Sequence, residues 1–283
     1  MAVVKIYDDF DLKKIAESGQ CFRAKEFENG LFRFVTKKKF IYIRKLDKNV
    51  FDVSCELTDW TGFWEKYFDL EENYMAIRVE IDKFSERFPF GNYLREAAKF
   101  GAGIRILRQE PFETLISFII SQRKSIPAIK KSIELICDSF GEILHTPYED
   151  IRTFPTPEKL SAASVLKLSN CGLGYRGAYI RDAVEKVRTR VVDLEDIIHS
   201  SNEDMLIELK EIKGVGDKIA NCVALYAYHR LNFSPVDVWI KRAIDEDFKG
   251  RNIFEEFGDH GGVLQQYVFF YKRLGEKEFN LED

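Results

Sequence analysis

Two patterns of hydrophobic and polar positions divide the chain into an N-terminal and a longer C-terminal part. Before residue 57, short runs rich in β-branched and aromatic residues alternate with turn signals such as Glu28-Asn29-Gly30. This pattern is typical of antiparallel strands and hairpins. From Leu57 onward, apolar residues recur at three- and four-residue spacing, which is the period of amphipathic helices. The predicted strands are 31–35, 40–43 and 50–53.

The C-terminal pattern predicts a series of helices joined by short connections. Prolines mark two of the starts, at Pro111 and at Thr156-Pro157, because proline suits the first helical turn. The predicted fold class is α+β, with an antiparallel sheet domain that also contains helices at 1–95 and a mostly α-helical domain at 96–283. The predicted helices are 112–122, 127–140, 176–187, 204–210, 217–229, 238–248 and 262–274.

Composition and cysteine spacing narrow the functional classes. The 283 residues, 45% hydrophobic and 32% charged, suit a globular protein with a substantial core. There is no apolar run of membrane-spanning length and no secretion-signal layout at the start, so we expect a cytoplasmic protein. The five widely spaced cysteines include no C-x-x-C pair, which argues against a disulfide framework and an iron–sulfur or zinc site. They are Cys21, Cys55, Cys137, Cys171 and Cys222.

The net charge of −4 is only weak evidence against a nucleic-acid partner, because phosphate binding depends on local charge. The segment 123–131 carries two charged residues at its start and two at its end, all of them basic. A solvated helix face is the alternative interpretation of such a run.

The segment 209–222 carries the chemistry. A short helix runs into Gly214-Val215-Gly216, and a second helix begins at once. Glycines permit positive φ angles and close backbone approach, and amides at a helix N-terminus can converge on a DNA phosphate. Such contacts position a protein on DNA without selecting a sequence. Taken alone, the same pattern fits a tight connection between two helices.

Lys218 follows in the first turn of the second helix, where the helix dipole favours the neutral, nucleophilic amine that can form a Schiff base. Nineteen residues later, Asp237 follows Pro235-Val236 and precedes an apolar-periodic stretch. An aspartate at this place is an N-cap by position, and taken alone it needs no other role.

Residues 212–218 followed by 235–237 resemble the helix-hairpin-helix and Gly/Pro-Asp signature of the DNA glycosylase superfamily. Four further stretches resemble its 8-oxoguanine DNA glycosylases, and the likeness extends over about residues 5 to 275. They are Ser18-Gly19-Gln20-Cys21-Phe22-Arg23, 107–111, 172–176 and 265–269.

The resemblance implies a two-lobed helical glycosylase core with its hairpin at 204–229. It also implies a monomeric, nucleoid-associated prokaryotic enzyme that flips 8-oxoguanine out of double-stranded DNA, excises it, and cleaves the strand by β-elimination through a lysine Schiff base. No cofactor or iron–sulfur cluster is expected. A Na⁺ or K⁺ ion at the hairpin would be held by the backbone carbonyls of Lys210, Ile212 and Val215.

The matched positions also imply roles for single residues. Lys218 attacks C1′ of the deoxyribose, and Asp237 stabilises the positive charge that develops on the sugar. The carbonyl of Gly19 accepts a hydrogen bond from N7–H of the oxidised purine, where guanine itself has an acceptor. Gln265 reads the Watson–Crick edge of the base. The residues that match the packing surfaces and border of the base pocket are Phe269, Cys222 and Tyr226.

The DNA-contacting positions depart from the family pattern in several places. Arg123 stands where an asparagine fills the gap left by the extruded base, and Tyr175 matches the aromatic wedge beside the orphaned base. Arg176 matches one of two arginines that read the opposite cytosine, with a phosphate contact as its alternative role. The other arginine position holds Ala128, which predicts a weaker preference for cytosine. Trp239 replaces a phosphate-contacting histidine. The hairpin residues Gly214, Val215 and Gly216 match the DNA-backbone contacts.

Other functions remain open at this level. Iron–sulfur glycosylases need four closely spaced C-terminal cysteines, and no cysteine follows Cys222. Alkylation-repair members lack the lysine that stands here at 218. A glycosylase for another damaged base, or a non-catalytic helix-hairpin-helix DNA-binding protein, is the nearest alternative. A small-molecule enzyme with a Schiff-base lysine would leave the glycines at 214 and 216 unexplained.

Overall fold

The structure, a computed structural model, describes residues 2–275, apart from the side chains of residues 165 and 166. Residues 276–283 of the predicted helical domain lie outside the described residues. The chain forms two compact units. Within the described residues, the first unit comprises 2–20, 43–108 and 229–275, and the second comprises 21–42 and 109–228. Each unit contains residues from both sides of the predicted domain boundary at residue 95. That boundary stays a prediction.

The predicted antiparallel strands are confirmed. In the first unit β1 (Ala2–Lys5) pairs with β5 (Val50–Val53), and β5 pairs with the second half of β4 (Lys39–Asp47). In the second unit β3 (Leu31–Thr36) pairs with β2 (Lys25–Glu26), and the strand order there is β4-β3-β2. A separate hairpin pairs β6 (Ile143–His145) with β7 (Asp150–Arg152). The sequence patterns did not predict β1, β2 or this second hairpin.

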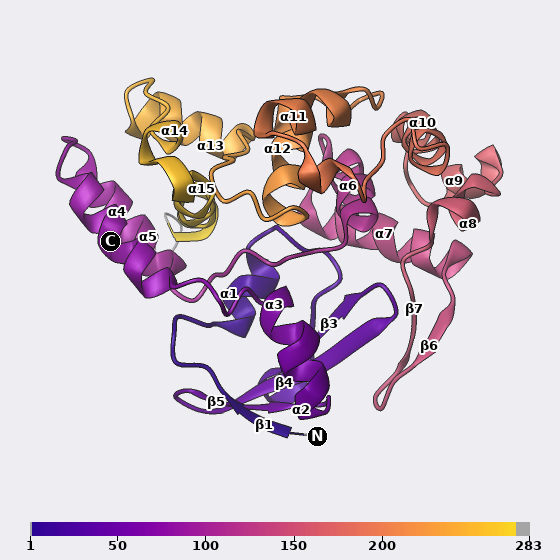
Figure 1. The fold of residues 1–283 in the computed structure, drawn as a ribbon, viewed down its shortest axis with the longest axis horizontal. Helices are drawn as coiled ribbons and strands as arrows, with labels where there is room; N and C mark the ends of the chain where they lie inside the picture. The colour runs from indigo at the N-terminus through magenta and orange to yellow at the C-terminus, as the bar shows by residue number, and fades with distance from the viewer. Residues whose placement is uncertain (1, 276–283) are drawn as a thin grey trace. The chain divides into compact units, whose positions relative to one another are not determined.

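The helices of the first unit pack mainly around α15, which contacts α5, α13 and α14, while α4 packs on α5 (Figure 1). This helix is buried along most of its length because it is apolar on almost every side. The helices are α1 (Leu12–Glu17), α2 (Leu57–Asp59), α3 (Glu65–Tyr67), α4 (Tyr74–Ser85), α5 (Gly91–Gly101), α13 (Val238–Arg242), α14 (Phe254–Phe257) and α15 (Gly261–Phe270).

In the second unit α6 contacts α7, α10 and α12, and α11 packs against α12 (Figure 1). No helix within the described residues is long and apolar enough to cross a membrane. The helices are α6 (Pro111–Ser121), α7 (Ile126–Phe140), α8 (Pro157–Ser161), α9 (Val165–Asn170), α10 (Arg176–Arg188), α11 (Asn202–Lys210) and α12 (Asp217–Tyr226).

Most predicted helix bounds agree with the structure to within two residues, but the predicted helix 217–229 is wrong at its end. It stops at Tyr226, and His229 has a φ of +54°, which no right-handed helix accommodates. The predicted helices 238–248 and 262–274 are α13 and α15, each extended by a π-helical turn, to Asp247 and Gly275 respectively.

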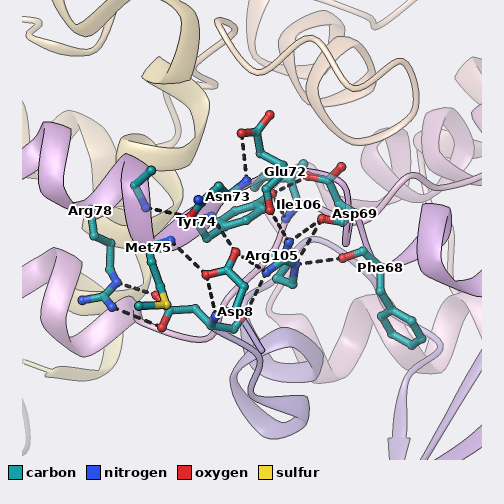
Figure 2. Close-up of polar contacts among 12 residues, drawn as sticks. Asp8, Phe68, Asp69, Glu72, Asn73, Tyr74, Met75, Arg78, Arg105 and Ile106 are labelled. Atoms are coloured by element: carbon teal, nitrogen blue, oxygen red, sulfur yellow. Dashed lines mark hydrogen bonds and ion pairs between the residues drawn. The ribbon is translucent and has the colours of Figure 1, made fainter. Parts of the chain in front are cut away.

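A buried arginine organises the polar interior of the first unit (Figure 2). Arg105 is fully buried, and its Nε donates to the carbonyls of Phe68 and Asp69 at 3.1 and 3.2 Å. Its terminal nitrogens donate to the carbonyl of Glu72 at 2.7 Å and to the Asp8 carboxylate at 3.0 Å. Because a buried charge is tolerated only when it is paired and hydrogen-bonded, these partners explain how it resides in an apolar core.

Candidate active site

The predicted hairpin is formed by α11, α12 and the turn between them in the second unit. Gly214 has a φ of +84°, and a Cβ placed there would lie 2.4 Å from Cδ2 of Tyr179. Glycine is therefore required at this position by both conformation and space. Gly216 has a φ of −105°, and a Cβ there would meet no atom within 4 Å. The positive φ is thus confirmed at Gly214 and absent at Gly216.

The start of α12 leaves backbone amides available for a ligand. Gly216 is its N-cap and supplies no side-chain hydrogen bond to the first turn. The first N–H groups of a helix have no intrahelical acceptor, and they carry the positive end of the helix dipole. On the other side of the turn, the carbonyl of Ile212 accepts a hydrogen bond from the N–H of Val215 at 3.0 Å. This bond closes the turn between the two helices.

Lys218 lies in the first turn of α12, as predicted. Its Nζ donates to the hydroxyl of Ser121 at 3.2 Å and lies 5.0 Å from the ring centroid of Phe118. The same ring stacks on Tyr226, with centroids 5.4 Å apart and an interplanar angle of 13°. Cys222, one helical turn after Lys218, is buried. The structure thus brings the predicted nucleophile together with an aromatic face and one hydroxyl acceptor.

The predicted DNA-contacting residues Arg123, Tyr175 and Arg176 differ in exposure. Arg123 is exposed and has a φ of +49°. Tyr175 is 52% exposed, and its ring meets Tyr179 edge-on at 5.7 Å. Arg176 is only 8% exposed, and its Nε donates to the carbonyl of Gln122 at 2.9 Å. Arg123 and Tyr175 are therefore presented to solvent, whereas the guanidinium of Arg176 is engaged by the protein backbone.

In the first unit, Asp237 is the N-cap of α13, as its position predicts. Its Oδ1 accepts hydrogen bonds from the backbone N–H groups of Trp239 and Ile240 at 3.0 and 2.9 Å. The cap fixes the direction of the carboxylate. Trp239 is half-buried, and the guanidinium of Arg242 lies 5.2 Å from its ring centroid.

The turn that carries Gly19 is held from both sides within the first unit. Gly19 has a φ of +79°, which glycine adopts without strain. The carbonyl of Ser18 accepts a hydrogen bond from Nε2 of Gln266 at 2.7 Å. The side chain of Gln20 donates to the Arg105 carbonyl and accepts from the N–H of Leu107, both at 2.8 Å. The predicted base-reading carbonyl therefore lies in a fixed turn.

Gln265 lies on α15 and is 3% exposed. Its Oε1 is buried and has no hydrogen-bond partner among the described residues. A buried amide oxygen without a donor costs about 1–3 kcal/mol, so such an atom in a native protein calls for an explanation. A bound ligand that donates an N–H group to this oxygen would provide that explanation.

Phe269 lies one turn after Gln265 on α15 and is partly exposed. The guanidinium of Arg273 lies 5.3 Å from its ring centroid and donates to the carbonyl of Glu17. Burial lowers the pKa of Arg273, and the negative charges of Glu17 and Asp237 oppose that shift. Arg273 therefore lies beside the predicted base-stacking ring, and the charge of the predicted catalytic carboxylate acts on it.

Sequence reasoning did not single out Ser121 or Arg273 as functional residues. Ser121 is 97 positions from the lysine that it contacts, and Arg273 is 256 positions from Glu17. No local pattern signals contacts over such separations. Only the fold brings each of these residues next to its partner.

Two family models match the chain. Residues 3–115 match the N-terminal domain of 8-oxoguanine DNA glycosylase, and residues 116–253 match the HhH-GPD superfamily of base excision DNA repair proteins. Among curated proteins, the probable N-glycosylase/DNA lyase of Methanothermobacter thermautotrophicus is 30% identical over an alignment of 200 residues, which covers 60% of this chain. The N-glycosylase/DNA lyase of Saccharomyces cerevisiae is 36% identical over an alignment of 160 residues, which covers 52% of the chain. The aligned stretches span 64% and 42% of these two relatives.

Solved structures match over nearly the whole chain. A structure of MBOgg1 in complex with a low affinity DNA ligand is 38% identical, with a TM-score of 0.88 and coverage of 97% of this chain and 96% of that one. The 8-oxoguanine glycosylase/lyase of Clostridium acetobutylicum, in complex with double-stranded DNA containing cytosine opposite 8-oxoG, is 33% identical. Its TM-score is 0.87, and the match covers 98% of this chain and 99% of the Clostridium chain. The chain therefore belongs to the 8-oxoguanine DNA glycosylase/lyase family, within the helix-hairpin-helix superfamily of base-excision repair proteins.

Proposed function

We propose that this protein excises 8-oxoguanine from duplex DNA and then cleaves the strand at the resulting abasic site. The observation that carries the proposal is the position of Lys218 in the first turn after the hairpin. Its amine lies against the ring of Phe118 and next to the hydroxyl of Ser121. Family membership supports the same chemistry, because similar chains are named N-glycosylase/DNA lyases or 8-oxoguanine glycosylase/lyases.

The first chemical step breaks the glycosidic bond. The nucleotide leaves the base stack at a cost of a few kcal/mol, because the sugar carbon is unreachable within the duplex. Nζ of Lys218 forms a bond to C1′, and the base departs with the bonding electron pair and acquires a proton. The carboxylate of Asp237 stabilises the positive charge that develops on the sugar.

The second step cleaves the strand. Loss of a proton from the amine and opening of the sugar ring give an imine between Lys218 and C1′. The imine acidifies the C2′ hydrogens. Removal of one of them lets the 3′ phosphate leave by β-elimination, so the electron pair of the broken C–O bond goes to the phosphate. No external oxidant or reductant is consumed.

Base recognition rests on groups that complement the oxidised purine. The carbonyl of Gly19 accepts from N7–H, which guanine lacks; a single hydrogen bond of this kind discriminates by about 1–3 kcal/mol. The buried Oε1 of Gln265, which has no hydrogen-bond partner among the described residues, suits the N–H donors on the Watson–Crick edge. Phe269 and Cys222 pack against the two faces of the base, and Tyr226 borders the pocket.

DNA is held through its backbone and through the gap that base extrusion leaves. The amides of the hairpin turn and the indole N–H of Trp239 bind phosphates. Arg123 and Tyr175, both exposed, enter the vacated space. Because Ala128 supplies no guanidinium, we expect a weaker preference for cytosine opposite the lesion.

The backbone carbonyls of Lys210, Ile212 and Val215 in the hairpin are suitable ligands for a monovalent cation. Carbonyl oxygens are hard ligands, and the Ile212 carbonyl accepts one hydrogen bond and keeps a second lone pair. A bound Na⁺ or K⁺ would add positive charge for a DNA phosphate. The side chain of Lys210 is engaged elsewhere, in an ion pair with Asp217 at 2.9 Å.

Borohydride trapping tests the proposed function. The protein is mixed with a duplex carrying one 8-oxoguanine opposite cytosine, and the reductant is added during turnover. A covalent adduct should form with the wild type and with Lys159→Gln, a surface control in which the lysine pairs with Glu142 at 2.5 Å. The adduct should disappear with Lys218→Gln.

Two other outcomes identify the alternatives. Release of a different damaged base, with 8-oxoguanine left intact, would indicate a glycosylase of another specificity. Absence of both adduct and base release, with equal affinity for damaged and undamaged duplex, would indicate a non-catalytic helix-hairpin-helix DNA-binding protein.

A further inference from the structure

Arg176 lies at the first position of α10, and its guanidinium is committed to backbone carbonyls. Nε donates to the carbonyl of Gln122 at 2.9 Å, and Nη1 donates to that of Leu173 at 3.3 Å. Nη2 donates to the carbonyl of Gln122 and, at 3.4 Å, to that of Arg123. A guanidinium has five N–H donors, so these four bonds leave one. A bidentate contact with a base edge needs two donors.

The two backbone segments that Arg176 joins carry the exposed side chains of the proposed DNA gap. One is the turn after α6, which contains Arg123; the other is the turn before α10, which contains Tyr175. The guanidinium carbon of Arg176 also lies 4.5 Å from the ring centroid of Tyr175. One buried side chain therefore touches both elements.

The conformation of Arg123 requires such support. A φ of +49° is in the left-handed region, which is strained for a residue with a Cβ and persists only where surrounding contacts impose it. Lys124 provides a second brace, since its Nζ donates to the carbonyl of Gly172 at 2.9 Å and to the hydroxyl of Ser132. Burial and the nearby charge of Arg176 both lower the pKa of Lys124, so the two cations lie close to each other at this turn.

We propose that Arg176 is a positioning residue that holds Arg123 in its left-handed conformation beside Tyr175, and that it does not read the opposite base. The two exposed side chains are thereby set for the vacated gap before DNA binds. This inference rests on the proposed function. Reading cytosine would instead require Arg176 to give up hydrogen bonds to the carbonyls of Gln122, Leu173 and Arg123.

The test is a set of single-turnover excision rates with cytosine, adenine, thymine or guanine opposite 8-oxoguanine. The proteins are the wild type, Arg176→Ala, Arg123→Ala and the double variant. Arg176→Ala should slow excision by about tenfold opposite every base and change the cytosine-to-adenine rate ratio by less than about twofold. In the Arg123→Ala background, the same change should slow excision by less than about threefold, because coupled residues are not additive.

Arg188→Ala is the matched control. Arg188 lies at the other end of α10, where it forms an exposed pair with Glu185 at 3.0 Å, and its loss should leave all four rates unchanged. Arg176→Lys keeps the charge but lacks the planar fork, so it should reproduce the loss seen with alanine. It also serves as the test variant if Arg176→Ala does not fold.

Two results would overturn the inference while leaving the proposed function intact. One is a loss confined to cytosine, which would identify Arg176 as a base reader. The other is an equal loss with and without Arg123, which would identify a general structural role. Failure of the wild type to release 8-oxoguanine from any of the four duplexes would instead overturn the proposed function itself.

Discussion

Replacing Gly214 with alanine tests the geometry of the hairpin on which the proposed DNA contact depends. The new Cβ would lie 2.4, 2.6 and 2.7 Å from three ring carbons of Tyr179, so the ring or the turn must move. Such overpacking costs about 1–3 kcal/mol. The φ of +84° adds about 1–2 kcal/mol for any residue with a Cβ. We therefore expect the free energy of unfolding to fall by about 2–5 kcal/mol.

Gly216→Ala is the internal control, because it makes the same chemical change two residues away. Its φ is −105°, and nothing lies within 4 Å of the added methyl group. The loss of a favourable N-cap glycine and the reduced entropy of the unfolded chain oppose each other, so the free energy of unfolding should change by less than about 1 kcal/mol.

Urea unfolding followed by circular dichroism measures both effects. Repeating Gly214→Ala in a Tyr179→Ala background separates the steric clash from the backbone strain at residue 214. Without the ring, only the backbone strain of about 1–2 kcal/mol should remain. Equal losses at the two glycines, or a loss at Gly214 that the Tyr179 change does not reduce, would refute this account of the turn.

Three further predictions concern the carboxylates and the buried arginine. Asp237→Asn keeps the helix cap but removes the charge, so thermal melting should change little while single-turnover excision slows by at least about 100-fold; equal rates would contradict the catalytic role. Burial, opposed by the charge of Arg23, raises the pKa of Glu113 from 4.5 to about 7. Between pH 4.5 and 7 the folded state therefore binds more protons than the unfolded state, so the free energy of unfolding should fall as the pH rises, by up to about 3 kcal/mol. Urea unfolding at pH 4.5 and 7.5 measures this difference, and Glu113→Gln should abolish it. Arg105→Met leaves the backbone carbonyls around it unpaired and should cost at least about 3 kcal/mol in the same assay, whereas a loss under 1 kcal/mol would show that these carbonyls find other donors.

The sequence alone determined the features whose causes act within a few residues. Strand and helix periods predicted the three central strands of the sheet and seven of the helices in the described residues, because side-chain direction repeats every two or 3.6 residues. The hairpin glycine, the lysine in the next turn and the aspartate cap followed from local rules of turn conformation and capping. Those rules also placed Lys218 and Asp237 correctly on their helices.

The tertiary structure decided what depends on partners far along the chain. Arg176 reads from sequence as a DNA-contacting cation, yet its guanidinium is engaged by carbonyls up to 54 residues away. The hydroxyl beside Lys218 comes from a residue 97 positions distant. The amide oxygen of Gln265, without a partner among the described residues, is likewise recognised only once α15 is packed. Packing brings these groups together and removes the water that would otherwise satisfy them, and no local pattern encodes either effect.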